Sequence, residues 1–210
     1  MVPAPIATVL IAAAISLPAG WLASFVATRE SGTTGLPLVA VIGASLAIGV
    51  WAALVMPALC RLGVTLALGW TLLVLGLVDL FAFRLPDILT LPLAVAGLLL
   101  SLWLPDRDPL SHLIGAAAGF LVLYLIALIY RHTRAREGLG LGDAKLAAAA
   151  GAWLGWQALP SVVLIACAAA FIWIGIGVAL RGRTVLTRQI AFGVPLCFAF
   201  WLVWLYGPPL

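Results

Sequence analysis

Charged residues are scarce in this chain of 210 amino acids: they make up 9% of it, whereas 65% is hydrophobic. The mean hydropathy is +1.25. A soluble domain of this size cannot bury so much apolar surface, so the composition excludes a soluble protein and predicts a polytopic membrane protein in contact with lipid. The excess of basic residues, a net charge of +4, bears on membrane topology. We therefore predict no nucleic-acid partner.

Paired cysteines are also lacking. Cys60, Cys167 and Cys197 lie in or at the ends of apolar runs, and no two of them form a CxxC pair. This pattern excludes a disulfide framework and a CxxC zinc site. The two histidines, His112 and His132, are too far apart in sequence to indicate a metal site. We therefore predict neither a metal nor a cofactor.

Apolar runs long enough to span a membrane, or nearly so, recur along the whole chain. The first has no basic residues before it, so it is predicted to be a spanning helix and not a cleaved signal. The eight runs cover about residues 4–26, 36–59, 64–83, 88–104, 112–130, 143–156, 160–180 and 190–206. The sequence thus predicts an all-α fold, a polytopic membrane helix bundle of about eight transmembrane helices, forming a single membrane-embedded domain over residues 1–210.

The basic residues predict the orientation of these helices, because cytoplasmic loops are enriched in Lys and Arg. With eight spans, the even-numbered loops and both termini hold only Arg61 and Arg107. The odd-numbered loops hold the other eight arginines: Arg29, Arg84, Arg131, Arg134, Arg136, Arg181, Arg183 and Arg188. The odd-numbered loops are therefore predicted to be cytoplasmic.

One stretch differs from the apolar background. Glycines alternate with leucines from Gly138 to Gly142, and Asp143 and Lys145 follow directly, at the start of an alanine-rich run. Glycine lets the backbone approach another segment closely, and an ionisable residue in a membrane segment indicates a functional site. The alternative is a loop that returns to the membrane with Asp143 capping the next helix.

A second acid, Asp79, lies near the end of the third apolar run, and the predicted topology places it at the same membrane face as Asp143. Two close carboxylates can share a proton, so that one acts as a base on water and the other as an acid. The alternative class is a small transporter in which both acids form a proton or cation site. Sequence spacing does not distinguish these two arrangements.

Two blocks of sequence resemble the type IV prepilin peptidases, membrane aspartyl proteases with a GxGD signature. The first contains Asp79 and the Leu85-Pro86-Asp87 element, and the second is the glycine stretch through Asp143 and Lys145. The resemblance implies that Asp79 and Asp143 are the catalytic acids, in a peptidase core at about residues 64–156. A weaker match is Phe192-Gly193-Val194-Pro195.

The resemblance also assigns roles to the neighbouring residues. Asp87 competes with Asp79 for the first catalytic position, and we prefer Asp79 because the family's first acid precedes the Leu-Pro-Asp element. Asp87 is instead expected to cap the fourth helix. Gly140 and Gly142 would let the backbone approach a substrate strand. Lys145 either tunes the carboxylates, holds a loop or extends to the membrane surface.

The implied substrate is a prepilin or pseudopilin, with a short basic leader in the cytoplasm followed by a hydrophobic helix that stays in the membrane. The implied location is the bacterial inner membrane, with the active site at the cytoplasmic face. Many members carry a cysteine-rich insertion between their first two helices, whereas here that loop, about residues 27–35, has no cysteine. We therefore expect a short form that acts as a protease and does not methylate its product.

Overall fold

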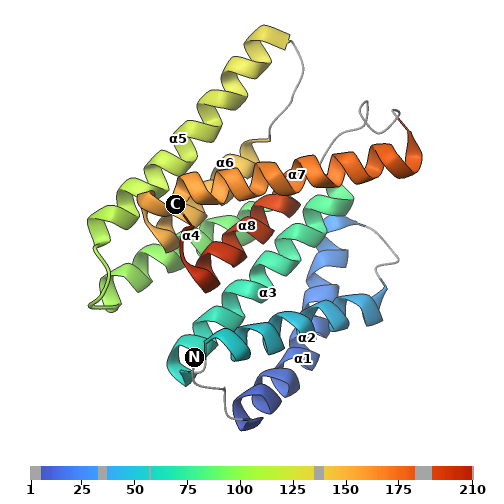
Figure 1. Cartoon of the computed structure of the whole chain (residues 1–210), viewed down its shortest axis with the longest axis vertical. Helices are drawn as coiled ribbons and strands as arrows, with labels where there is room; N and C mark the ends of the chain where they lie inside the picture. The colour runs from blue at the N-terminus through green and yellow to red at the C-terminus, as the bar shows by residue number, and fades with distance from the viewer. Residues whose placement is uncertain (1–5, 33–36, 57, 135–139, 183–190, 210) are drawn as a thin grey trace. The chain divides into compact units, whose positions relative to one another are not determined.

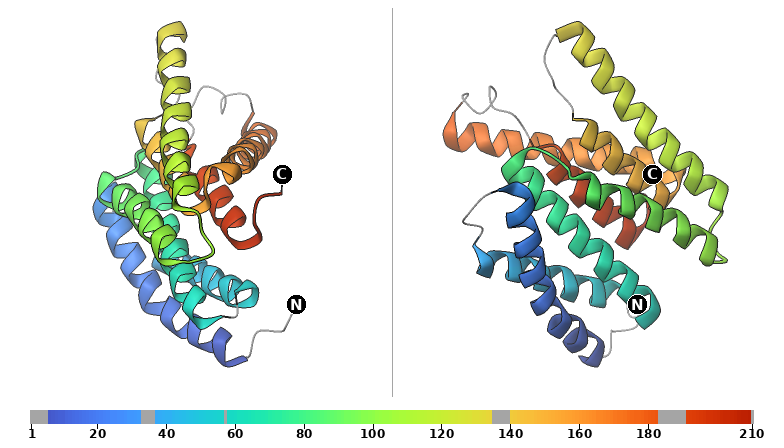
Figure 2. Two further views of the ribbon diagram at one scale, coloured as in Figure 1. Left: turned by 90° about the vertical axis from the view of Figure 1, so that its left-hand side faces the viewer. Right: turned by 180° about the vertical axis from the view of Figure 1, so that it is seen from behind.

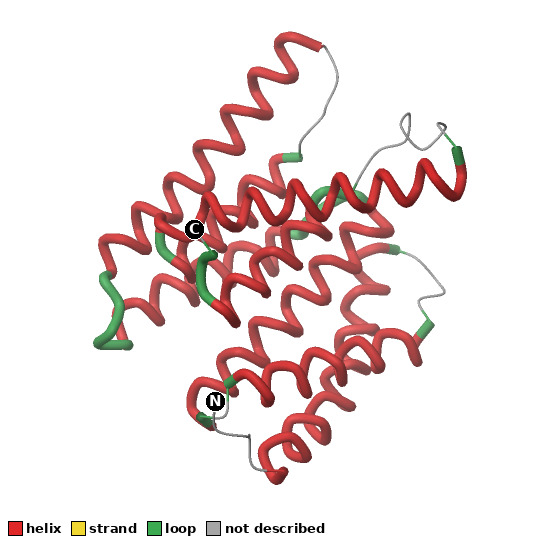
Figure 3. Tube along the Cα trace, in the orientation of Figure 1, coloured by secondary structure: helices red, strands yellow, loops and turns green. Residues whose placement is uncertain are grey.

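The computed structural model of the chain describes residues 6–32, 37–56, 58–134, 140–182 and 191–209 (Figure 1). All regular secondary structure in these ranges is helical, as Figure 3 shows. The helices are α1 (Ile6–Ser31), α2 (Leu38–Val55), α3 (Leu59–Ala82), α4 (Asp87–Trp103), α5 (Pro109–Arg134), α6 (Leu141–Leu154), α7 (Leu159–Arg181) and α8 (Gly193–Tyr206). The predicted all-α bundle with eight helices is confirmed.

The helices differ in whether their length suffices for a membrane crossing. Within the described residues, α1, α2, α3, α5 and α7 are long and apolar enough to cross, while α4 and α8 are apolar but shorter. Helix α6 has 14 residues, which corresponds to about 21 Å and is less than the hydrocarbon thickness of a bilayer. Helix α6 is therefore short for a full span.

The chain divides into two compact units, Met1–Ala82 and Phe83–Leu210, and each is described by itself. In the first unit, α1 and α2 pack along small residues, and α3 packs against both. The Ser45 hydroxyl donates a hydrogen bond of 2.8 Å to the carbonyl of Ser16 across this seam. Small residues let helix backbones approach closely. The prediction of a single domain over residues 1–210, with a peptidase core at about residues 64–156, stays a prediction.

In the second unit, helix α6 packs against α4, α5, α7 and α8, which can be followed around it in Figure 2. Its alanines make this possible, because they are buried on several sides of the helix. Where α5 crosses α6, Gly115 and Gly151 lie so close that a Cβ atom on Gly151 would overlap the Gly115 carbonyl. Helix α6 is thus fixed closely against its neighbours.

The C-terminal end of α6 is held by side chains from the start of α5 and the loop before it. The Arg107 guanidinium donates to the Trp153 carbonyl at 2.6 Å. The Nδ1 atom of His112 lies 2.9 Å from the Ala152 carbonyl, and because a carbonyl only accepts, this nitrogen carries the proton. The last carbonyls of a helix have no partner within the helix, so these two side chains complete the short helix.

The Trp153 side chain joins α6 to α4 and α8. Its Nε1 donates to the Leu93 carbonyl at 2.7 Å, and its ring makes edge contacts with Phe200 and Trp204. The Arg107 guanidinium lies 4.9 Å from the centre of the Trp204 ring, a cation–π geometry. Helix α6 is therefore anchored at the end far from Asp143.

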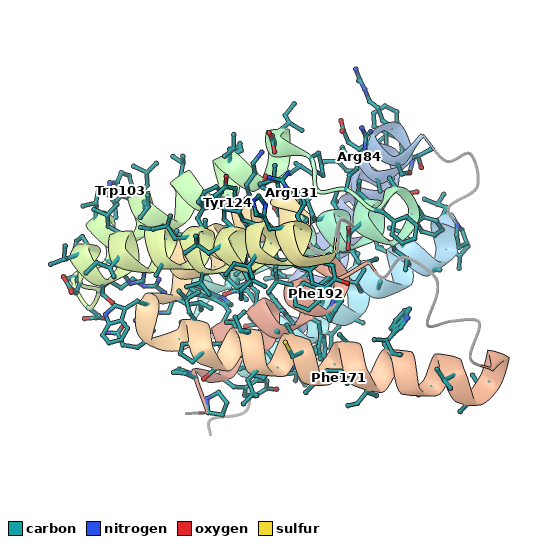
Figure 4. The ribbon with its side chains drawn as sticks, turned by 90° about the horizontal axis from the view of Figure 1, so that it is seen from above. Arg84, Trp103, Tyr124, Arg131, Phe171 and Phe192 are labelled. Atoms are coloured by element: carbon teal, nitrogen blue, oxygen red, sulfur yellow. The ribbon has the colours of Figure 1, made fainter. Side chains whose placement is uncertain are left out.

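Large apolar side chains cover the outer faces of α5 and α7. Phe171, labelled in Figure 4, is 74% exposed, and Ile172 and Trp173 beside it are also exposed. A contiguous exposed apolar surface of this kind is unusual for a soluble protein. It is typical of helices that face lipid.

Candidate active site

Asp143 lies in the first turn of α6 and is 7% exposed. Its Oδ2 atom accepts a hydrogen bond of 3.1 Å from the backbone N–H of Gly140. In return, the Asp143 N–H donates to the Gly140 carbonyl at 3.1 Å. This is the acidic half of a capping box, and the helix dipole favours a negative charge there. Asp143 thus does support the helix start, and the same bond fixes the direction of its carboxylate.

Gly142, beside Asp143, packs against the segment that precedes α4. A Cβ atom on Gly142 would lie 2.9 Å from the Leu85 Cβ and 3.3 Å from the Leu85 nitrogen. No larger residue fits without a shift of one segment. Gly142 thus makes a close approach to Leu85 inside the protein, and its predicted approach to a substrate strand stays a prediction.

Gly140 differs from Gly142 in both conformation and surroundings. It is exposed and extended, with φ −77° and ψ 149°, and a Cβ atom there would make only ordinary contacts, the nearest at 3.5 Å. Gly142 lies within α6, so it is not part of an extended stretch. The remainder of the stretch, residues 137–139, lies outside the described residues.

Lys145 and Asp87 form an ion pair. The Lys145 Nζ atom lies 2.6 Å from Oδ1 and 2.7 Å from Oδ2 of Asp87. Asp87 is the first residue of α4, and the N-cap is Pro86, with no side-chain hydrogen bond to the helix start. The expectation that Asp87 caps α4 is therefore wrong, because its carboxylate is directed to Lys145 on another helix.

Asp79 lies in the last turn of α3 and is 5% exposed. Its neighbour Val78 is fully buried. Asp79 belongs to the first unit and Asp143 to the second, so their pairing as a dyad stays a prediction. Directly after α3, Phe83 has φ 52°, a left-handed conformation that bulky residues rarely adopt, and no sequence pattern indicated this turn.

Among the described residues, no three His, Cys, Asp or Glu side chains are grouped so that they could hold a metal ion. The site residues that the structure brings together are Asp143 with Gly140, Gly142 with Leu85, and Lys145 with Asp87. The contact with Leu85 was not predicted, although the Leu85-Pro86-Asp87 element stood out in the sequence.

The sequence profile of the type IV leader peptidase family matches residues 66–176, which is more than half of the chain. The chain belongs to this family. The matched range contains Asp79, Asp87, Asp143 and Lys145. It starts close to the predicted core boundary at residue 64 and continues into α7. No solved structure shows a significant match to this leader peptidase homologue.

Curated relatives in several bacteria carry the name prepilin leader peptidase/N-methyltransferase. The protein from Aeromonas salmonicida (strain A449) is 45% identical over 143 residues, which is 68% of this chain and 48% of that protein. The protein from Pectobacterium carotovorum subsp. carotovorum is 39% identical over 176 residues, 83% of this chain and 59% of that protein. The protein from Burkholderia pseudomallei (strain K96243) is 45% identical over 122 residues, 58% of this chain and 39% of that protein. This family member thus spans about half the length of the curated relatives it matches.

Proposed function

We propose that this chain is an aspartyl endopeptidase that removes the leader peptide of type IV prepilins or pseudopilins. The observation that carries the proposal is the position of Asp143. Its carboxylate is buried at the start of a helix, and a hydrogen bond from the Gly140 N–H fixes its direction. The names of the relatives support the same reaction. Asp79 is the proposed second acid, since it is the other buried carboxylate among the described residues.

The reaction needs one carboxylate in each protonation state. The ionised carboxylate removes a proton from water, and the water oxygen bonds to the scissile carbonyl carbon. The protonated carboxyl group donates its proton to the carbonyl oxygen. When this intermediate collapses, its hydroxyl returns a proton to the second carboxylate and the carbonyl re-forms. The C–N bond breaks, and the leaving nitrogen takes the proton that the first carboxylate removed from water. Two close carboxylates supply this pair of states because they cannot both ionise easily.

The proposed location is the cytoplasmic face of the bacterial inner membrane. The distribution of the arginines supports it, because eight of the ten lie in the odd-numbered loops or at the helix ends next to them. The substrate helix would stand in lipid beside the enzyme, with its leader directed toward Asp143. A peptide bond in a helix is shielded, so the segment near the cut must be extended for water to attack. The N–H and carbonyl of Gly140 are both bonded to Asp143, and the exposed surface at Gly140 is the proposed place for that segment to lie.

The test is co-expression with a type IV prepilin precursor and separation of precursor from shortened product on a gel. The Asp79→Asn and Asp143→Asn variants should abolish cleavage while the protein accumulates in the membrane. Asp106→Asn is the matched control, because Asp106 is an exposed acid in the loop after α4, and it should cleave normally. Undiminished cleavage by either dyad variant, or an intact precursor with the unmodified enzyme, would contradict the proposal.

A further inference from the structure

The ion pair between Lys145 and Asp87 links two helix starts that are 58 residues apart in sequence. Both carboxylate oxygens of Asp87 accept from the same ammonium group, at 2.6 and 2.7 Å. The side chains are 29% and 56% exposed. Ion pairs with this exposure add little to the free energy of unfolding. The contact therefore matters for where it holds the two helix starts.

Two contacts of α6 flank Asp143 in the sequence, one made by the residue before it and one made by Lys145 after it. Gly142, the residue before Asp143, packs on Leu85. Lys145, two residues after Asp143, reaches Asp87. The segment from Leu85 to Asp87 is therefore attached to the first turns of α6 at two points that flank Asp143. A rotation of α6 about its axis, or a shift along it, would break one or both contacts.

We propose that Lys145 and Asp87 are a positioning pair that holds the first turns of α6, and with them Asp143, in the working position, and that neither residue exchanges a proton in the reaction. The inference rests on the proposed function, in which Asp143 acts on the peptide bond. The Lys145 ammonium group is directed at Asp87, and both carboxylate oxygens of Asp87 accept from it. A displacement of about 1 Å at a reacting group can lower a rate by about 100-fold, so a weak contact can matter for catalysis.

The experiment is a double-mutant cycle with Lys145→Met, Asp87→Asn and the variant that carries both. Each single change breaks the same contact, so each should lower kcat by about 10- to 100-fold with KM little changed. The double variant should lose no more than the more damaged single variant, because the contact can be lost only once. Arg131→Met is the control for removal of a positive charge, since Arg131 on α5 is exposed.

The pH profile separates positioning from proton transfer. The double variant removes one charge of each sign, so the net charge near Asp143 is unchanged and its kcat–pH profile should match that of the unmodified enzyme. Lys145→Arg and Asp87→Glu keep an ion pair and should retain most of the activity. All enzymes are compared as full-length protein in detergent, with a type IV prepilin precursor as substrate.

Several results would overturn the inference. If the loss of kcat in the double variant equals the product of the two single losses, the residues act independently. If one limb of the kcat–pH profile disappears in the double variant, one of the two residues carries a proton in the reaction. Full activity of either single variant would also contradict it. Failure of the variants to accumulate would make the pair a folding contact instead. Failure of the proposed function is distinct, because there the unmodified enzyme leaves the precursor intact or Asp143→Asn still cleaves it.

Discussion

Gly142 packs so closely on Leu85 that a Cβ atom at position 142 would lie 2.9 Å from the Leu85 Cβ. Two residues earlier, a Cβ atom on Gly140 would meet its nearest neighbour at 3.5 Å. The two glycines of the GxGD signature therefore do different things. Gly142 sets the distance between α6 and the segment before α4, while Gly140 is exposed and has room for a side chain.

Substitution of these two glycines should separate folding from substrate docking. Gly142→Ala must displace Leu85 or the first turn of α6, so it should lower both the Tm in detergent and the rate of leader cleavage. Gly140→Val fits the extended backbone at that position, so its Tm should match that of the unmodified enzyme while KM for the precursor rises. Equal loss of Tm in both variants, or unimpaired cleavage by Gly140→Val, would contradict this division.

The crossing of α5 and α6 gives a prediction for stability. A side chain at Gly151 would overlap the backbone carbonyl of Gly115, and backbone cannot move aside as a flexible side chain can. Gly151→Ala should therefore cost about 1–3 kcal/mol, the usual effect of overpacking a core. Gly175→Ala in α7 is the matched control, because a Cβ atom there meets nothing within 4 Å. Thermal unfolding in detergent measures both, and an unchanged Tm for Gly151→Ala would show that the helices can separate freely.

The end of α6 gives a second stability prediction. Arg107→Ala removes the 2.6 Å hydrogen bond to the Trp153 carbonyl and the contact with the Trp204 ring. A hydrogen bond from a charged group contributes about 1.5–3 kcal/mol, so the Tm should fall clearly. Arg131→Ala, an exposed arginine on α5, should leave the Tm unchanged. Equal Tm values for the two variants would mean that water replaces the guanidinium at this carbonyl.

The helices were predictable because the bilayer dictates them. A helix that crosses the bilayer needs a long apolar run. Such runs are visible in the sequence, and residues 160–180 correspond to α7 (Leu159–Arg181). Helix ends were less predictable: α1 continues to Ser31, five residues past the apolar run that was predicted to end at residue 26, because polar residues can continue a helix outside the apolar layer.

The contacts between helices were not predictable from one sequence. Hydropathy indicates that Asp87 and Lys145 are unusual, but not that they meet across 58 residues. The same holds for Arg107, whose partner Trp153 is 46 residues away. Such pairs depend on which helix faces which, and apolar periodicity in a membrane protein carries little of that information because lipid-facing and buried positions are both hydrophobic.

The last prediction concerns methylation of the cleaved product. The relatives are named as peptidases and N-methyltransferases. The loop between the first two helices of this chain contains no cysteine, where many members of the family carry a cysteine-rich insertion. We therefore expect that cells carrying only this chain of 210 residues as their leader peptidase yield mature pilin with an unmodified N-terminal amine. Mass spectrometry of the purified pilin measures this directly.

The control is the Asp143→Asn variant, which should leave the precursor uncut and so shows that the mature pilin depends on this enzyme. A mass increase of one methyl group that disappears when this chain is deleted and cleavage is supplied by another peptidase would show that the chain methylates its product after all.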